Sequence, residues 1–271
     1  MIGMSKLVGL AEAAAMIPDG AVVAMGGNVM HRSPAALARA LARRGARGLH
    51  FVKTAAAYDA DLLCACGCLA SVSAGYVGYE SEFGLAPHYR KAVESGSVEA
   101  REHACYTIIT ALRAAIQGVS FLPVKGLEGS DLPAARGWKT VSDPYTGAVF
   151  VAIPAIRPDW AVIHVQEADR LGNGRILGPR YEDVLLAKAS RNVILTAERV
   201  VDRLDCAIEA VDISGFMVSA VVAAPGGARP CSCAGRYGID VPGTRSLVES
   251  PVGSAADAHL SLYARNDGGA L

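Results

Sequence analysis

Short apolar runs alternate with amphipathic helical patterns along most of this chain, and that alternation limits the folds open to it. Residues 21–25 (AVVAM) form a continuous apolar run, which is typical of a strand buried on both faces. Leu37 and Leu41 then recur four positions apart, with arginines on the opposite side, which predicts an amphipathic helix. Further strands are expected at 49–52, 121–124, 148–153, 160–165, 193–196 and within 217–230. Further helices are expected at 10–17, 59–66, 87–95, 106–117, 181–190 and 259–265. The pattern predicts an α/β fold, with a largely parallel sheet covered by helices.

The sequence gives no reason to divide the chain into several domains. No internal repeat, low-complexity linker or composition break interrupts its 271 residues. We therefore expect one domain over residues 1–271. The glycine- and serine-rich tail, from about residue 231 to 271, is expected at the periphery of that domain.

Charge and hydrophobicity argue against several classes of protein. The 26 basic and 26 acidic residues cancel, so the balance indicates neither a nucleic-acid nor an anionic-membrane partner. Charged residues make up 19%, below the roughly 25% of an average soluble domain, which predicts surface hidden in a subunit interface. No uncharged apolar run reaches the roughly 18 residues of a membrane span, and the first residues lack a signal-peptide pattern. We therefore expect a cytoplasmic protein.

The seven cysteines indicate buried thiols rather than a metal centre. Five of them form C-x-C arrangements at residues 64–68 and 231–233, whereas zinc knuckles and thioredoxin-like sites use C-x-x-C. The odd number and the apolar setting of the first group favour reduced, buried side chains. We expect no bound metal and no bound cofactor.

The turn at residues 25–34 (MGGNVMHRSP) joins the first core strand to its helix. Ser33 suits a helix N-cap and Pro34 suits the first helical position. Free backbone N–H groups at a helix start can hold an anion or a developing oxyanion. The glycines do not spell G-x-G-x-x-G, so a dinucleotide fingerprint and a Rossmann dehydrogenase are not supported. An ordinary strand–helix turn remains an equal alternative.

Carboxylates gather between residues 80 and 102. Glu80, Glu82, Glu99 and Glu102 are candidates for acid–base chemistry or for a carboxylate nucleophile, and a solvated face with ion pairs is the alternative for each. His31 and His103 lie nearby in sequence, but no serine-hydrolase spacing accompanies them. The loop at 126–131 (GLEGSD) follows a predicted strand and suits either the lining of a cleft or a surface turn.

These motifs, in this order, resemble the α (A) subunit of family I CoA-transferases, of the glutaconate CoA-transferase α-subunit type. The resemblance covers about residues 5–225. Its matching segments are 24–27 with Pro34, 78–81, 84–87, 112–115 through 121–123, 129–131, 143–147, 154–159, 164–169 and 172–173.

The resemblance implies a NagB/RpiA/CoA-transferase-like fold and a partner β (B) subunit in an α2β2 or higher hetero-oligomer. It implies CoA transfer between an acyl-CoA and a carboxylic acid, expected to be a dicarboxylate, through a glutamyl-CoA intermediate. The nucleophilic glutamate belongs to the β subunit, in a Glu-x-Gly setting that follows a strand. After the strand expected at 121–124, Glu128 adjoins Gly129 directly, so this chain does not match that setting there. The resemblance assigns oxyanion donation to Gly26, Gly27, Asn28, Ser33, Ala35 and Ala36. It assigns contact with the acyl group to Glu80, Ser81, Glu102, Gly126, Gly129 and Ser130.

Two alternatives to CoA transfer remain open. The same scaffold also serves acyl-CoA decarboxylases and ring-opening hydrolases. The ring-opening relatives carry an acidic residue shortly after the Ala-Arg-Glu segment, and residues 102–106 (EHACY) offer none beyond Glu102 itself, which disfavours ring opening. A non-catalytic CoA-ester binding protein is the alternative of another class.

Overall fold

A central sheet with parallel main strands organises the computed structural model, which describes residues 4–251, 256–265 and 267. Its strand order is β11-β10-β8-β1-β2-β3-β4, and each neighbouring pair is parallel. A short strand, β9, pairs antiparallel with β8. The strands are β1 (Val22–Met25), β2 (Leu49–Ala56), β3 (Leu69–Val77), β4 (Glu99–Glu102), β8 (Trp160–Asp169), β9 (Gly174–Arg175), β10 (Asn192–Val201) and β11 (Ala220–Ala223). The predicted α/β fold with a largely parallel sheet is confirmed.

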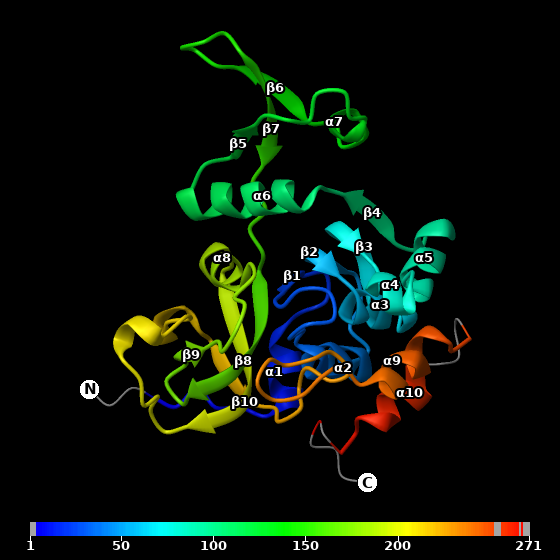
Figure 1. The fold of residues 1–271 in the computed structure, drawn as a ribbon, viewed down its shortest axis with the longest axis vertical. Coiled ribbons are helices and arrows are strands. Elements are labelled where there is room, and N and C mark those ends of the chain that lie inside the picture. The colour runs from blue at the N-terminus through cyan, green and yellow to red at the C-terminus, as the bar shows by residue number, and fades with distance from the viewer. Residues whose placement is uncertain (1–3, 252–255, 266, 268–271) are drawn as a thin grey trace.

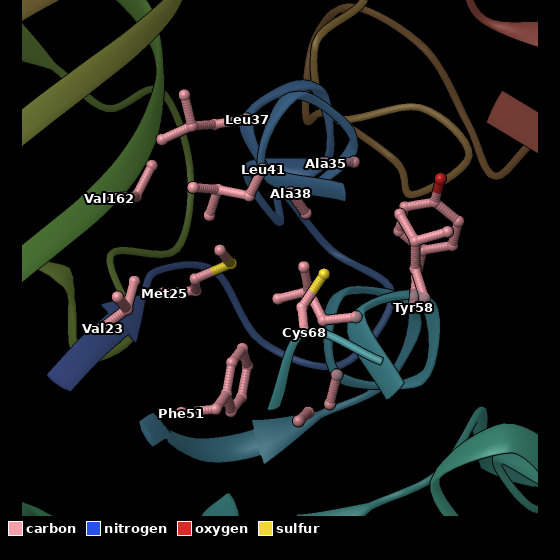
Figure 2. Close-up of a cluster of buried hydrophobic side chains, with 14 of the residues drawn as sticks. Val23, Met25, Ala35, Leu37, Ala38, Leu41, Phe51, Tyr58, Cys68 and Val162 are labelled. Atoms are coloured by element: carbon pink, nitrogen blue, oxygen red, sulfur yellow. The ribbon is translucent and has the colours of Figure 1, made fainter. Parts of the chain in front are cut away.

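Helices cover both faces of this sheet, because strand residues alternate between two cores. Val23 and Met25 of β1 face one core, and Ala24 faces the other. The larger core includes residues of α1 (Leu10–Met16), α2 (Ala35–Arg44), α3 (Tyr58–Ala65), α5 (Pro87–Glu94), α9 (Val241–Val248) and α10 (Ala256–Leu262). The second core lies under α6 (Cys105–Gln117) and α8 (Asp183–Ala189). Figure 2 shows Met25 and Phe51 of the sheet opposite Leu37 and Leu41 of α2.

A separate antiparallel sheet forms an arm beyond α6 (Figure 1). Its order is β5-β7-β6, with β5 at Phe121–Val124, β6 at Lys139–Ser142 and β7 at Val149–Pro154. The sequence placed β5 and β7 in the general strand–helix alternation and did not predict β6. The turn at 143–148 reverses the chain directly from β6 into β7, with the Asp143 N–H donating to the Ala148 carbonyl over 2.7 Å. Such a hairpin pairs its strands antiparallel, so the arm stays outside the parallel sheet.

The sequence analysis missed β3, β4 and α9. β3 (LASVSAGYV) is built largely from small residues, and β4 (EARE) is charged because it forms an edge of the sheet. The other short helices are α4 (Glu80–Phe83), α7 (Leu132–Ala135), η1 (Ile208–Ala210) and η2 (Gly215–Met217). No helix among the described residues has the length and apolar character needed to cross a membrane.

The tail beyond residue 230 packs against α2 and α3. Leu247 and Leu260 join the larger core, and Asp267 forms an ion pair of 2.7 Å with the buried Arg39. Tyr58 of α3 hydrogen-bonds His259 over 2.8 Å. Residues 252–255, 266 and 268–271 of the predicted tail lie outside the described residues.

The strand order reverses between β1 and β8. From β1 the sheet grows outward through β2, β3 and β4, and on the other side through β8, β10 and β11. Loops at the carboxyl ends of such central strands diverge and leave a crevice where α/β proteins bind ligands. The loops that follow β1, β2 and β3 and those that lead into α6 and α8 are therefore the candidate region.

Candidate functional site

Strained backbone marks the loops of this region. Val29, Arg32, Glu80 and Tyr181 are non-glycine residues with positive φ, at 43°, 54°, 61° and 46°. Val29 and Arg32 follow β1, Glu80 follows β3, and Tyr181 precedes α8. The Arg32 guanidinium carbon lies 5.6 Å from the centroid of the Tyr181 ring, so two of these loops touch. Left-handed non-glycine residues cost free energy and gather at functional sites, which supports a site at this edge.

The glycine turn after β1 holds an anion that comes from the chain itself. Gly27 N–H donates to Asp183 Oδ1 over 2.8 Å, and a Cβ on Gly26 would lie 2.2 Å from the same oxygen. Arg32 Nη2 lies 2.5 Å from Asp183 Oδ2, and both side chains are buried. The anion-binding chemistry predicted for this turn is present, but the carboxylate of α8 occupies it.

The other donors expected in this turn also have partners within the chain. The Gly26 N–H donates to the Val162 carbonyl, Asn28 to His31, Ala35 to Ser33, and Ala36 to Gly227, over 2.8 to 2.9 Å. The predicted helix start is wrong by one residue, because α2 begins at Ala35 with Pro34 at its N-cap. An external oxyanion would have to displace one of these internal acceptors.

Ser33 serves a buried ion pair instead of capping α2. Its hydroxyl donates to Asp59 Oδ2 over 2.7 Å, and Lys53 Nζ lies 2.6 Å from the same oxygen. The guanidinium of Arg32 similarly donates to the carbonyls of His164 and Pro179. Lys53 and Arg32 are thus neutralised or bonded internally, which leaves neither free for a substrate.

The predicted acyl-contacting residues occupy two parts of the fold. Glu80 and Ser81 begin α4 and are exposed at the carboxyl edge of the sheet. Burial raises the pKa of the Tyr181 phenol; the charge of Arg32 opposes this shift, and the charges of Asp183 and Glu80 add to it. Glu102, at the end of β4, is exposed and adds to the raised pKa of Tyr89 on α5, which results mainly from burial.

The loop at 126–131 belongs to the arm. Gly126, Gly129 and Ser130 are exposed, with φ of 93° and 80° at the two glycines. Glu128 accepts the Gly126 N–H over 2.7 Å, so this carboxylate supports its own loop. The structure therefore holds these three residues on a different element from the turn after β1.

The amino end of α6 is a part of the edge that the sequence analysis missed. Cys105 begins this helix and is exposed, and its Sγ donates to the Thr54 carbonyl over 3.4 Å. Burial raises the pKa of the Cys105 thiol, and the charge of Glu182 adds to that effect. A Cβ on Gly75 of β3 would lie 2.3 Å from the Cys105 nitrogen, so that glycine permits the close approach of α6. A lone cysteine after Ala104 gave no local signal of this position.

One group of side chains has the composition of a metal site. Ligand atoms of His164, Glu198 and Cys233 lie within 4.8 Å of one another. His164 Nε2 is 2.8 Å from Glu198 Oε1, and its Nδ1 is 2.8 Å from the Thr196 hydroxyl. Glu198 also accepts hydrogen bonds from Tyr237 and from the Gly226 N–H. Both ring nitrogens and the carboxylate are satisfied by protein groups, so the arrangement is complete as a hydrogen-bond network.

Comparison with known proteins identifies the family of this chain. Residues 8–224 match the family described as coenzyme A transferase. The A subunit of 3-oxoadipate CoA-transferase from Pseudomonas knackmussii is 34% identical, over 88% of this chain and 85% of that protein. The IpdA subunit of the cholesterol ring-cleaving hydrolase from Mycobacterium tuberculosis is 33% identical, over 90% and 88%. An Archaeoglobus fulgidus protein is 36% identical over 83% of this chain, and this chain spans about half of its length, 51%.

Two solved structures have closely similar folds. The decarboxylase AibA/AibB, solved as a variant, superimposes with a TM-score of 0.87 at 34% identity and covers 97% of this chain and 100% of its own. Glutaconate CoA-transferase from Acidaminococcus fermentans superimposes with a TM-score of 0.87 at 27% identity, covering 96% and 88%.

Proposed function

This chain belongs to the coenzyme A transferase family, as its motifs predicted, and we propose that it forms one half of a CoA-transferase active site. It is the A-type subunit, and a B subunit of similar fold completes the crevice in an α2β2 or higher assembly. The substrates are a CoA thioester and a carboxylic acid, which we expect to be a dicarboxylate.

The observation that carries this proposal is the match to CoA-transferase A subunits over most of the chain. The A subunit of 3-oxoadipate CoA-transferase aligns over 88% of this chain. In the loop that follows β5, Glu128 directly precedes Gly129, without the intervening residue of the Glu-x-Gly motif. The Glu-x-Gly triplets of this chain, 82–84 and 94–96, have their glutamates on helices α4 and α5 rather than directly after a strand. The carboxylates exposed at the edge, Glu80 above all, then line the acyl pocket instead of attacking the thioester.

The reaction proceeds by two exchanges at the partner's glutamate. Its carboxylate oxygen adds to the thioester carbon, the C–S bond breaks, and CoA leaves as a thiolate from an acyl-glutamyl anhydride. The thiolate then adds to the glutamyl carbonyl, the acid leaves as a carboxylate, and a glutamyl-CoA thioester remains. The second acid reverses these steps and departs as the new acyl-CoA. This chain contributes residues that line the pocket of the acyl group.

Decarboxylation or hydrolysis of an acyl-CoA is the second candidate. It is favoured by the similarity to AibA/AibB at 34% identity and to the IpdA subunit at 33%, values level with that of the transferase subunit. These chemistries need no glutamyl-CoA intermediate, so trapping that intermediate separates them from transfer.

Co-expression with the protein of the adjacent reading frame tests the proposal. The purified pair should transfer CoA from an acyl-CoA to acetate or glutarate, and either chain alone should not. Failure of the two chains to associate, or an associated pair that releases carbon dioxide or free CoA without transfer, would contradict it.

A further inference from the structure

The hydroxyl of Thr54 is the unsatisfied polar group that lies beside the candidate crevice. Thr54 is 3% exposed, and its Oγ1 has no hydrogen-bond partner among the residues that the structure describes. Buried hydroxyls are nearly always bonded, so each exception calls for an explanation, such as a ligand that is missing.

This hydroxyl faces the amino end of α6. Val52, two residues earlier on β2, packs in the core under α6 with Ile108 and Leu112. Alternate residues of a strand share a face, so Thr54 points to the same side. It lies further toward the carboxyl end of β2, where Cys105 of α6 bonds its carbonyl over 3.4 Å.

The first turn of α6 adds donors of its own. Within the described chain, the N–H groups of Cys105 and Tyr106 have no backbone acceptor, whereas those of Thr107 and Ile108 both donate to the Ala104 carbonyl. The helix runs for 13 residues, so its dipole places partial positive charge at this end. Gly75 of β3 lets the turn sit close to the sheet.

The charges near the Thr54 hydroxyl and the first turn of α6 favour a neutral ligand over an anionic one. Glu182 is close enough to add to the raised pKa of the Cys105 thiol, and Arg32 is bonded to Asp183. Glu182 would repel a permanent carboxylate as soon as it binds. It would repel a developing oxyanion only in the transition state, where the hydroxyl and N–H donors would have to offset that repulsion. A thioester carbonyl is neutral when it binds and becomes negative only when a nucleophile adds to its carbon and the π electrons move onto the oxygen.

We propose that the Thr54 hydroxyl and the first-turn N–H groups of α6 bind the carbonyl oxygen of the acyl-CoA. They would stabilise the oxyanion before the C–S bond breaks and CoA leaves as a thiolate. The site replaces the donors expected after β1, whose N–H groups have internal acceptors. Rotation of the exposed Cys105 side chain about χ1 is the motion that admits the oxygen. This inference rests on the proposed acyl-CoA chemistry.

The test compares Thr54→Val and Thr54→Ser in the complex with its partner subunit. Thr54→Val should lower kcat at least roughly tenfold with KM within about threefold, because loss of one oxyanion donor acts on the transition state. Thr54→Ser should retain most activity. Thr244→Val is the matched control: the buried Thr244 hydroxyl on α9 donates to the carbonyl of Asp240, the N-cap residue of that helix, so this change should lower the unfolding midpoint and leave kcat unchanged. Thr54→Val should not lower that midpoint.

Carbonyl infrared spectra of 13C-labelled butyryl-CoA give a readout that does not depend on turnover. Bound to the wild-type complex, the C=O stretch should lie below its frequency in water, and Thr54→Val should reverse most of that shift. The shift without CoA transfer would support the site and reject the transferase function. Transfer with no effect of Thr54→Val on kcat would reject the site alone. A rise in KM confined to glutaryl-CoA would assign Thr54 to a distal carboxylate and overturn the inference. Failure of the complex to bind either butyryl-CoA or glutaryl-CoA would reject both proposals.

Discussion

The ion pair between Asp183 and Arg32 is buried beside the glycine turn, and Asp183→Asn should destabilise the fold by leaving the Arg32 charge without its partner. Asp183 accepts from Arg32 over 2.5 Å and from the Gly27 N–H over 2.8 Å, with the two side chains 0% and 3% exposed. Removing one partner of a buried pair costs about 3–5 kcal/mol, because the other charge is left uncompensated in the interior. Asparagine keeps the size and one acceptor oxygen, so we expect the lower end, about 3 kcal/mol.

Thermal unfolding followed by circular dichroism measures this cost. A loss of about 3 kcal/mol corresponds to a fall in Tm of roughly 6–12 °C, scaled from domains somewhat smaller than this chain. Glu94→Gln is the control, since Glu94 pairs with Arg90 over 2.7 Å where both side chains are more than half exposed. An exposed pair contributes about 0–1 kcal/mol, so Tm should change little. Equal, small shifts for the two variants would refute the assignment of Asp183 as the anion of the glycine turn.

Three further predictions follow from the same geometry. Burial lowers the pKa of His103 to about 4 from an ordinary value of 6.5, so only the unfolded chain gains this proton between those values. The free energy of unfolding should therefore fall as the pH is lowered from 6.5 to 4, by up to about 1.4 kcal/mol per pH unit. Urea unfolding measured at a series of pH values should show a smaller fall for His103→Gln over this range. Gly75→Ala should lower Tm, because the added Cβ would lie 2.3 Å from the Cys105 nitrogen. Gly238→Ala, where the added Cβ meets open space, should leave Tm unchanged. Equal Tm values for the two variants would contradict the close packing of α6 against Gly75. Glu182→Gln should speed alkylation of Cys105 by iodoacetamide at pH 8, read by peptide mass spectrometry, and an unchanged rate would show that Glu182 does not act on the thiol.

The fold could be predicted from sequence wherever a local pattern was strong. The apolar run of β1, the amphipathic face of α2 and the long helix α6 all appear close to their predicted positions. β3 and β4 were missed because small residues in one and charges in the other hide the strand pattern. The arm was misplaced because a strand pattern does not state its pairing direction, which the turn at 143–148 decides.

The site could be predicted only in part, because its partners are distant in sequence. The glycine turn was identified as an anion-binding element, but its anion is Asp183, 156 residues after Gly27. Thr54 and Cys105 meet across 51 residues, and neither stands in a motif of its own. Local spacing identifies a turn that can hold an oxygen, and only the tertiary fold determines whether that turn is already filled.

Locating the glutamyl-CoA intermediate tests the central claim that this chain supplies the non-nucleophilic wall of the site. The complex is incubated with acyl-CoA, reduced with borohydride and digested, and the modified glutamate is identified by peptide mass spectrometry. The proposed function predicts a single reduced glutamate, on the partner subunit, with Glu80 and Glu102 of this chain unmodified. A reduced glutamate in this chain, or none in a complex that transfers CoA, would contradict it.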